Sequence, residues 1–285
     1  GATRGAPPGA RRRLAGVPEG DTIHKIAGFL APRLRSRRLA RVEMADSATA
    51  SRCMGRLVRG VTARGKHLFI ELDDDTALRS HLGMYGTWHF YAPGEDWRKP
   101  VSQASLVLAT EDAVYVCFNA REVELVRAPS VRERVLGMRL GPDLLIEDGS
   151  LDVIVRRARE ILERDTLLAD VLLDQRVASG IGNVYKSEVL FLEHRSPLTR
   201  LGDIGNTGLE RCYATAAGLL RRNLGGGPRI TRFEKDGAGR LWVYGRRGQP
   251  CLRCDGRIES ARLGRDHRST YWCNKCQRNP GARGP

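Results

Sequence analysis

The pattern of apolar and polar positions changes twice along this chain. Between residues 40 and 127, β-branched and aromatic residues form short runs separated by turn-forming residues. These runs are HLFIELD, TWHFY, ASLVLAT, AVYVCFN and VELVRA. Short strands with regular turn signals are typical of a two-sheet β-sandwich.

Helical periodicity replaces this pattern between residues 150 and 224. Apolar positions recur every three or four residues in SLDVIVRRAREILER, TLLADVLLDQ, NVYKSEVLFLEH and TGLERCYATAAGLLRRNL. An earlier helix is expected to begin at Thr22, with Asp21 as its N-cap and Pro32 at its end. The sequence therefore predicts an α+β fold, with an N-terminal β-sandwich flanked by helices and a helical domain after it.

Composition shifts suggest four segments. The first seventeen residues are rich in Gly, Ala, Pro and Arg and contain no acid, so we expect them to be disordered or not native. A glycine-rich link, GGGP, follows the last helical pattern, and a cysteine-rich segment comes after it. The predicted boundaries are 1–17 for the extension, 18–145 for the sandwich, 146–243 for the helical domain and 244–285 for a zinc finger and tail.

The charge of the chain narrows the class of partner. Of 285 residues, 41% are hydrophobic and 28% charged, the net charge is +15 and the pI is about 10.1. This excess of positive charge indicates a polyanionic partner, most commonly a nucleic acid, although a high net charge can also serve only to keep a protein soluble. No run of eighteen apolar residues occurs, so no membrane span is expected.

Four of the seven cysteines form the strongest chemical signal. CLRC at 251–254 and CNKC at 273–276 are separated by eighteen residues, a spacing that suits a tetrahedral zinc site with four cysteine ligands. Two disulfides or free thiols are the alternative, which a reducing, intracellular setting disfavours. With four thiolate ligands no position stays open for water, so the expected zinc is structural. The ligands would be Cys251, Cys254, Cys273 and Cys276.

The remaining cysteines, Cys53, Cys117 and Cys212, lie in periodic apolar stretches and are expected to be buried. The residues between the two cysteine pairs are expected to fold back as a β-hairpin. That hairpin is rich in arginine and includes Arg268, so we expect it to approach phosphate groups.

A second anion-binding signal lies at SGIGNVYKSEVLF, residues 179–191. A glycine-rich turn before a helix that opens at Asn183 exposes backbone N–H groups to an anion. Lys186 could add a second phosphate contact, or it could be a solvated helix lysine. An ordinary helix–turn–helix corner with Asn183 as a simple cap is the alternative for the whole motif.

Together these pieces resemble the formamidopyrimidine-DNA glycosylase/endonuclease VIII family. The motifs, in family order, are PEGD at 18–21, RGKHLF at 64–69, SHLGMYGTW at 80–88, SGIGNVYKSE at 179–188 and the tail ending YWCNKCQ. The resemblance implies a β-sandwich, a helix–two-turn–helix domain and a zinc finger. It also implies a bifunctional DNA glycosylase/AP lyase of base-excision repair that acts on damaged double-stranded DNA as a monomer, in the bacterial cytoplasm or nucleoid.

The resemblance also assigns the catalytic residues. Pro18 looks like the nucleophile, because a free α-amino group has a pKa of about 8 and is partly neutral near neutral pH. Attack on sugar C1′ would expel the base and leave an iminium that favours elimination. Glu19 would act as the acid/base at the sugar ring, and Lys66 would hold a nearby phosphate and assist proton transfer. Outside this motif, Lys66 would be read as a solvated strand lysine.

Further residues match the DNA contacts of the family. Met84 and Tyr85 stand in the loop that family members push into the gap left by a flipped nucleotide, although Met84 alone could be a core residue. Asn183 and Arg268 match phosphate contacts from the helical domain and the hairpin. Arg121 lies in the region that contacts the opposite strand.

Two departures from the family pattern matter. Thr22 stands where many members carry glutamate, and the PEGDT form looks like the endonuclease VIII branch, which favours oxidised pyrimidines. Pro18 is internal in this sequence, so its nitrogen is a tertiary amide that cannot form an iminium. A GTG start codon read as Val17 would yield a chain that begins at Pro18 once the initiator methionine is removed.

Two hypotheses therefore stay open. In the first, the working enzyme begins at Pro18 and excises oxidised pyrimidines by the proline mechanism, with the base pocket near residues 226–234. In the second, residues 1–17 block the proline and the chain is a damaged-DNA-binding protein without proline-based catalysis; within the enzyme class, Lys66 or another amine could replace the proline.

Overall fold

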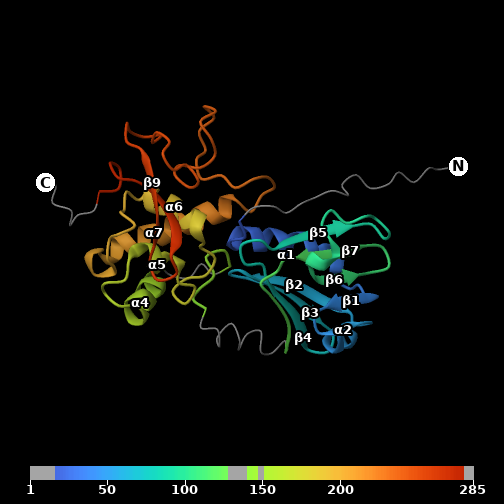
Figure 1. Ribbon diagram of the computed structural model, residues 1–285. Coiled ribbons are helices and arrows are strands. Elements are labelled where there is room, and N and C mark those ends of the chain that lie inside the picture. Colours follow the sequence, from blue (N-terminus) through green and yellow to red (C-terminus); the bar gives the residue numbers. More distant parts are fainter. Residues whose placement is uncertain (1–16, 128–139, 147–150, 279–285) are drawn as a thin grey trace. The chain divides into compact units, whose positions relative to one another are not determined.

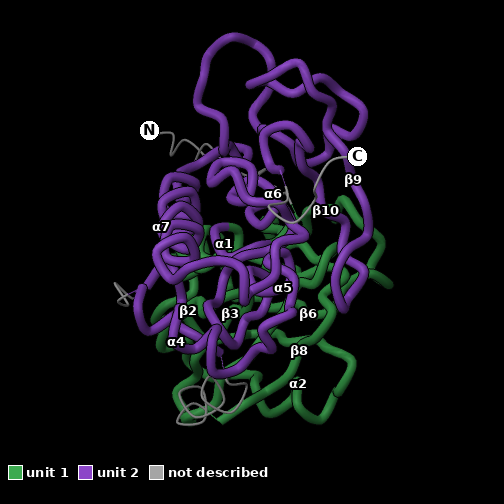
Figure 2. Tube along the Cα trace, turned by 90° about the vertical axis from the view of Figure 1, so that its left-hand side faces the viewer, with its two compact units in different colours: residues 1–18, 22–135 green, residues 19–21, 136–285 purple. Residues whose placement is uncertain are grey.

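The computed structural model describes residues 17–127, 140–146 and 151–278. The chain divides into two compact units, residues 1–18 with 22–135 and residues 19–21 with 136–285 (Figure 2). The predicted helical domain and zinc finger thus fall in one unit, which also takes Glu19–Asp21 from the N-terminal turn. The expectation for residues 1–16 lies outside the described residues.

The first unit holds two four-stranded antiparallel sheets, visible in Figure 1. One sheet has the order β1-β6-β7-β5 and the other β2-β3-β4-β8. Among the residues that the structure describes, this unit also contains helices α1 (Gly20–Leu34) and α2 (Ser47–Cys53) and the short 3-10 turn η1 (Val101–Gln103). The strands are β1 Arg41–Met44, β2 Val58–Arg64, β3 His67–Leu72, β4 Thr76–His81, β5 Thr87–Tyr91, β6 Ala104–Ala109, β7 Val114–Phe118 and β8 Glu122–Arg127.

One apolar cluster connects both sheets and α1. Leu30 of α1, Ile70 of β3 and Tyr115 of β7 are all at most 2% exposed and belong to this cluster. The alternation of buried and exposed residues along β2 gives that strand one face toward the core. The two-sheet sandwich predicted from the sequence is confirmed.

Several details of this unit differ from the expectation. Strands β1, β2 and β4 were not anticipated, and α1 begins at Gly20 rather than after an Asp21 cap. Pro32 does not end α1 but lies inside its last turn. Arg33 Nη1 donates to the Phe29 carbonyl at 2.8 Å, which helps this last turn to persist after the proline removes one N–H donor.

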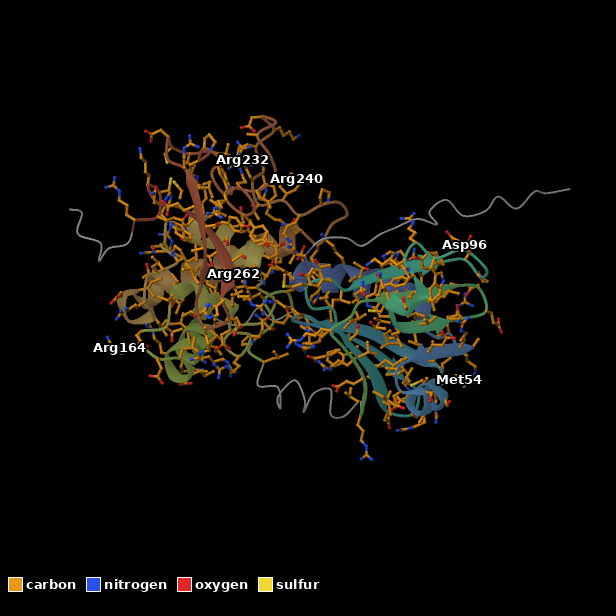
Figure 3. All side chains as sticks on the ribbon, viewed as in Figure 1. Met54, Asp96, Arg164, Arg232, Arg240 and Arg262 are labelled. Atoms are coloured by element: carbon orange, nitrogen blue, oxygen red, sulfur yellow. The ribbon has the colours of Figure 1, made fainter. Side chains whose placement is uncertain are left out.

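The second unit is helical and ends in a hairpin. The helices described in this unit are α4 (Leu151–Ile161), α5 (Leu168–Leu173), α6 (Asn183–Leu192) and α7 (Asn206–Arg222), with a short 3-10 turn η2 at Leu201–Asp203. Apolar residues of all four helices share one buried cluster, as the helical periodicity predicted. Arg232 and Arg240 lie on the irregular segment between α7 and the hairpin, and Arg262 lies on β9 (Figure 3).

Strands β9 (Ile258–Leu263) and β10 (Arg268–Cys273) form the predicted hairpin, with Arg268 paired to Leu263 in register. A second cluster packs Phe191 of α6 against Trp242 and the cysteine residues. The isolated cysteines Cys53, Cys117 and Cys212 are at most 1% exposed, which confirms their expected burial.

Candidate active site

The side chain of Glu19 is anchored at the N-terminus of α6. Its Oε2 accepts from the N–H of Gly182 at 2.9 Å and of Tyr185 at 3.3 Å, and its Oε1 accepts from the N–H of Val184 at 2.8 Å. Glu19 is 1% exposed. The helix N-terminus thus serves as an anion site, and the anion it binds is a carboxylate of the protein itself.

Glycine makes this close approach possible. A Cβ on Gly182 would lie 2.5 Å from Cδ of Glu19, so any larger residue there would displace the carboxylate. The N–H of Gly20 donates to the carbonyl of Gly180 at 2.8 Å, and a Cβ on Gly20 would lie 2.8 Å from Cα of Gly180. The two glycine-containing motifs, PEGD and SGIGN, therefore fit against each other backbone to backbone.

Asp21, in the first turn of α1, pairs with an arginine 208 residues away. Nη2 of Arg229 lies 2.5 Å from Oδ1 of Asp21, and Nη1 lies 3.7 Å from Oε1 of Glu19. The guanidinium carbon lies 4.8 Å from the ring centroid of Tyr185. Burial by itself would lower the pKa of Arg229, but the carboxylates of Glu19 and Asp21 outweigh it and raise the pKa.

The proposed nucleophile stands directly before this turn. Pro18 is buried, and Val17 before it is 37% exposed. Val17 lines a cavity of about 430 Å³ together with Met84, Tyr85, Gly86, Thr87, Lys99 and Asn119. Lys66 stands in the turn between β2 and β3 and is half-buried.

The two residues that the resemblance expects to insert into the DNA duplex lie in the first unit. Met84 and Tyr85 lie in the turn between β4 and β5 and are 53% and 75% exposed, so Met84 is not a core residue. Gly83 before them has φ +62°, and a Cβ there would lie 3.0 Å from Cβ of Arg121. The N–H of Arg121 donates to the His81 carbonyl at 2.9 Å, so Arg121 lies beside this exposed turn.

A polar cluster lies in the β2-β3-β4-β8 sheet of the same unit. Arg79 of β4 is buried and donates to Glu122 and Glu124 of β8, each at 2.7 Å. It also lies 2.8 Å from Nδ1 of His67, whose ring centroid is 4.8 Å from that of His81. Burial, then the neighbouring His81 and Arg79, lower the pKa of His67 to about 3.

The structure corrects the expectation for Lys186. Lys186 is fully buried, and its Nζ donates to Asn183 Oδ1 at 3.2 Å, to the Ser269 carbonyl at 3.1 Å and to Thr270 Oγ1 at 2.7 Å. Its ammonium therefore holds β10 against α6 instead of facing a phosphate, because three protein oxygens take its three donors. Since Oδ1 of Asn183 accepts one of these bonds, the NH2 group of Asn183 faces away from Lys186.

The hairpin carries the second expected phosphate contact next to this anchor. Arg268 directly precedes Ser269, and its side chain is 38% exposed, with its Nε 4.0 Å from Asp266. A hydrogen bond from the N–H of Arg265 to Oδ2 of Asp170 at 3.0 Å holds the tip of the hairpin against α5. Asn183 thus accepts a hydrogen bond from the buried Lys186 ammonium, and Arg268 directly precedes Ser269, whose carbonyl accepts another.

A second buried carboxylate on α6 organises the segment before the hairpin. Glu188 accepts from the backbone N–H groups of Trp242, Val243 and Tyr244 at 2.8–2.9 Å and from the hydroxyl of Thr231. Burial raises the pKa of Glu188 despite these donors. No sequence motif indicated this role.

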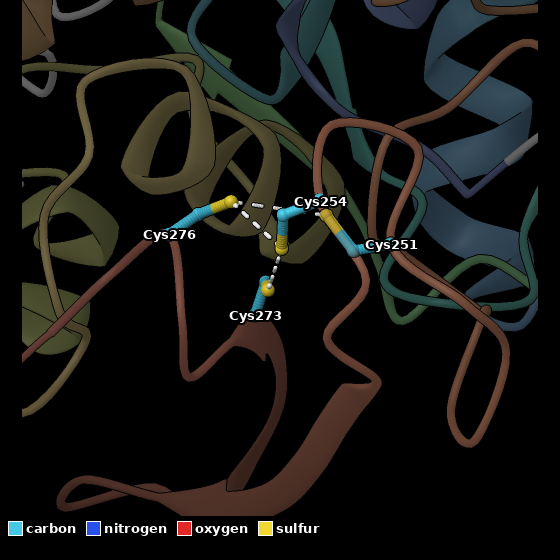
Figure 4. Close-up of side chains that lie close together, drawn as sticks. All are labelled: Cys251, Cys254, Cys273 and Cys276. Atoms are coloured by element: carbon cyan, nitrogen blue, oxygen red, sulfur yellow. Dashed lines mark hydrogen bonds between the residues drawn. The ribbon is translucent and has the colours of Figure 1, made fainter.

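The four cysteines of the tail converge on one point (Figure 4). Their Sγ atoms all lie within 4.8 Å of one another, with separations of 3.8 Å for Cys251–Cys276, 3.6 Å for Cys254–Cys273 and 3.5 Å for Cys254–Cys276. A tetrahedral ion with Zn–S bonds of about 2.3 Å requires S–S separations of about 3.8 Å. The N–H groups of Arg253 and Gly256 donate to sulfur, as suits thiolate ligands. The residues fit one structural zinc.

Three family models match the chain, one for each part of the described architecture. The family model of the formamidopyrimidine-DNA glycosylase N-terminal domain matches residues 17–126, that of its H2TH domain residues 140–234, and that of the zinc finger found in FPG and IleRS residues 248–279. The described architecture has the same three parts in the same order.

Curated relatives extend this match to nearly the whole chain. A probable endonuclease 8 2 of Streptomyces coelicolor is 36% identical over 273 residues, which cover 94% of this chain and 96% of the relative. The DNA-(apurinic or apyrimidinic site) lyase Nei2 of Mycolicibacterium smegmatis is 34% identical over 92% of this chain and 99% of its own length. The chain belongs to the formamidopyrimidine-DNA glycosylase/endonuclease VIII family.

Solved structures agree in fold. The Lactococcus lactis formamidopyrimidine-DNA glycosylase bound to AP-site DNA superimposes with a TM-score of 0.78 at 22% identity, over 92% of this chain and 100% of that one. The wild-type L. lactis protein with DNA containing N7-benzyl-Fapy-dG gives 0.79 at 23% identity over the same shares. At this level of identity the likeness shows the fold.

Proposed function

We propose that this chain excises oxidised bases through Pro18, once that residue is the free N-terminus, and then cleaves the strand. As a family member it is a DNA glycosylase/AP lyase of base-excision repair. The observation that carries the proposal is the anchored carboxylate of Glu19, which fixes the residue bonded to Pro18 against the N-terminus of α6.

The chemistry follows from a secondary amine. The lone pair of the Pro18 nitrogen attacks C1′, the glycosidic bond breaks, and the base leaves with its electron pair and gains a proton. The ring of the sugar opens to an iminium, which acidifies the proton on C2′. Loss of that proton and breakage of the C3′–O bond complete β-elimination, and a second elimination at C5′ would complete δ-elimination.

Glu19 and Lys66 take part in proton transfer in this proposal. Glu19, adjacent to the nucleophile, lies in a fixed position and delivers or accepts the proton at the sugar ring oxygen. Lys66, in the turn between β2 and β3, holds a phosphate near the lesion. Thr22 leaves this site one carboxylate short of the common family pattern and is 8% exposed.

The DNA partner is proposed to be a duplex with an oxidised pyrimidine. Met84 and Tyr85 would fill the gap left by the flipped nucleotide, since both are exposed on one turn beside Arg121. Asn183 and Arg268 would hold phosphates.

We further propose that the enzyme acts as a monomer in the bacterial cytoplasm or nucleoid. The curated relatives that support this setting are bacterial. Within the described part of the chain, no helix has both the length and the hydropathy needed to cross a bilayer.

Borohydride trapping tests the proposal. A chain that begins at Pro18 is incubated with a duplex containing an oxidised pyrimidine, and reduction of the iminium should leave a covalent protein–DNA adduct. Pro18→Gly in the same chain keeps a free amine of lower substitution, whereas a chain that retains Val17 has no amine there. If the chain from Pro18 forms no adduct with any oxidised-base or abasic duplex, the proposal is wrong.

A second candidate function is damaged-DNA binding without proline catalysis. The peptide bond between Val17 and Pro18 in this sequence favours it, because an amide nitrogen cannot form an iminium. This second function predicts tight binding to lesion duplexes without cleavage, even after residues 1–17 are removed. A Lys66→Ala variant that abolishes trapping while Pro18→Gly does not would instead assign the nucleophile to a lysine.

A further inference from the structure

We infer that Arg229 is a positioning residue for the reaction, which acts by holding Glu19 and Asp21 in place. This inference rests on the proposed function, because the turn that Arg229 holds is the one that carries Pro18. The expected pocket segment, residues 226–234, includes Arg229, but no sequence pattern assigned it this role.

The geometry favours a role inside the protein over a DNA contact. The side chain of Arg229 is 11% exposed, and its Nη2 and Nε lie 2.5 Å and 3.4 Å from the two carboxylate oxygens of Asp21. Its Nη1 faces Glu19 at 3.7 Å, and its planar group lies beside the fully buried Tyr185 ring. A guanidinium held on two carboxylates and one aromatic ring is not available to a phosphate.

Charge balance explains why the arginine is needed. Glu19 and Asp21 are each 1% exposed and only two residues apart, so their carboxylates repel each other and each carries a desolvation cost. The backbone N–H groups at α6 stabilise Glu19, and the guanidinium of Arg229 forms an ion pair with Asp21. Without Arg229, Asp21 would be drawn toward those donors or toward solvent, and the turn that carries Pro18 would move with it.

Arg229 is itself preorganised by the segment around it. The amide of Asn223, at the C-terminus of α7, accepts from the N–H of Ile230 at 2.8 Å and donates to the Ile230 carbonyl at 2.7 Å. Thr231 is bonded to the buried Glu188. The backbone on the C-terminal side of Arg229 is therefore fixed to α7 and α6, and the guanidinium transmits that fixed position to the N-terminal turn.

The test compares variants of the zinc-loaded chain that begins at Pro18. Arg229→Ala should lower the single-turnover rate of adduct formation about 10- to 100-fold, because small misplacements of reacting groups have effects of this size. The Kd for a duplex with a tetrahydrofuran abasic analogue should change by about threefold or less. Millimolar guanidinium should restore part of the rate of Arg229→Ala, and Arg229→Lys should retain more activity than Arg229→Ala.

Two further variants separate positioning from folding. Asp21→Asn/Arg229→Gln removes both charges of this ion pair, and Glu19 keeps its three backbone N–H donors, so the variant should fold and still react slowly. Arg211→Ala removes an arginine that pairs with Glu193 at the other end of α6, at 3.0 Å, and should react like the parent. In an Asp21→Asn background, Arg229→Ala should cost about twofold or less, because its effect is exerted mainly through its ion pair with Asp21.

Some results would overturn the inference. An Arg229→Ala rate within about threefold of the parent would do so, as would a Kd that weakens by the same factor as the rate, which would make Arg229 a DNA contact. Full additivity of Arg229→Ala with Asp21→Asn would also contradict it. A parent chain that forms no adduct at all contradicts the proposed function instead, so the two failures are distinguishable.

Discussion

The carboxylate of Glu19 accepts a hydrogen bond from the backbone N–H of Val184 at 2.8 Å, across 165 residues of sequence. This bond joins the turn that carries Pro18 to the first turn of α6. Two further N–H groups of the same helix end bind the second carboxylate oxygen. The carboxylate of the N-terminal motif is therefore held by the glycine-rich motif of the helical domain.

The first prediction concerns Glu19→Gln. An amide in this position presents an NH2 group toward backbone N–H donors, so the side chain cannot keep all its contacts or carry out the proton transfer proposed for Glu19. Excision of an oxidised pyrimidine should fall about 100-fold or more, as expected for a lost proton-transfer group. Cleavage of a preformed abasic site should fall less, because no base has to leave. Single-turnover assays on the two duplexes measure both rates.

Glu193→Gln, at the C-terminal end of α6, is the matched control and should leave both rates unchanged. Equal losses on the two substrates in Glu19→Gln would contradict a role in base departure.

The second prediction separates a buried anchor from a phosphate contact. Lys186→Met removes the bonds that hold β10 to α6 and should lower the free energy of unfolding by about 2–3 kcal/mol. It should weaken DNA binding without changing the slope of log K against log salt. Arg268→Ala should reduce that slope by about 1, because it removes a cation that we propose contacts a phosphate. Fluorescence anisotropy over a salt series measures the slopes.

If Lys186→Met reduced the slope as Arg268→Ala does, Lys186 would contact a phosphate after all, and the buried position described here would not be the one it adopts with DNA.

The third prediction concerns the metal. Elemental analysis should find one zinc per chain, and Cys254→Ser should lower this content and impair DNA binding, since the hairpin that carries Arg268 depends on the ion. Cys53→Ala, in the first unit, should keep the full zinc content. Zinc retained at one per chain after Cys254→Ser would show that the ion is not held by this cluster.

The fourth prediction concerns pH. The pKa of His67 is lowered from 6.5 to about 3, mainly by burial, so the unfolded chain binds a proton that the folded chain excludes. Stability therefore rises with pH across this window and is lost as pH falls from about 6.5 toward 3. Between pH 6.5 and 4.5, His67→Gln should lose about 1–2 kcal/mol less stability than the parent, given the partial exposure of the ring.

Thermal or urea unfolding at several pH values checks this. His267→Asn is the control, because His267 is exposed on the hairpin turn with φ 49°, a conformation that asparagine tolerates. If His67→Gln followed the pH dependence of the parent, titration of His67 would not be the cause.

Most of the architecture could be predicted because it depends on local sequence patterns. The strand-like runs, the helical periodicity and the cysteine spacing each reflect a single element or motif. Strand β4 was not predicted, because it is buried along almost its whole length and shows no alternation of apolar and polar residues. It also includes Arg79, a charged residue that sequence patterns do not predict to be buried. Its burial depends on Glu122 and Glu124 of β8, more than forty residues away.

The site was predictable only in part, for the same reason. The family resemblance assigned roles to Pro18 and Glu19, whereas local patterns assigned Lys186 to a phosphate and Asp21 to a helix cap. Lys186 is buried because β10 supplies two oxygens for its ammonium, and Asp21 lies in the first turn of α1, where Arg229 pairs with it. These partners are 83 to 208 residues away in sequence, and no local pattern reveals them.

The most direct test of the central claim is borohydride trapping with the chain that begins at Pro18. The measurement is the yield of covalent adduct with an oxidised-pyrimidine duplex, followed by mass spectrometry of the peptide that carries the DNA. The proline mechanism predicts an adduct on the N-terminal proline, and its absence when Val17 is retained. An adduct on a lysine, or the same yield with Val17 present, would contradict it.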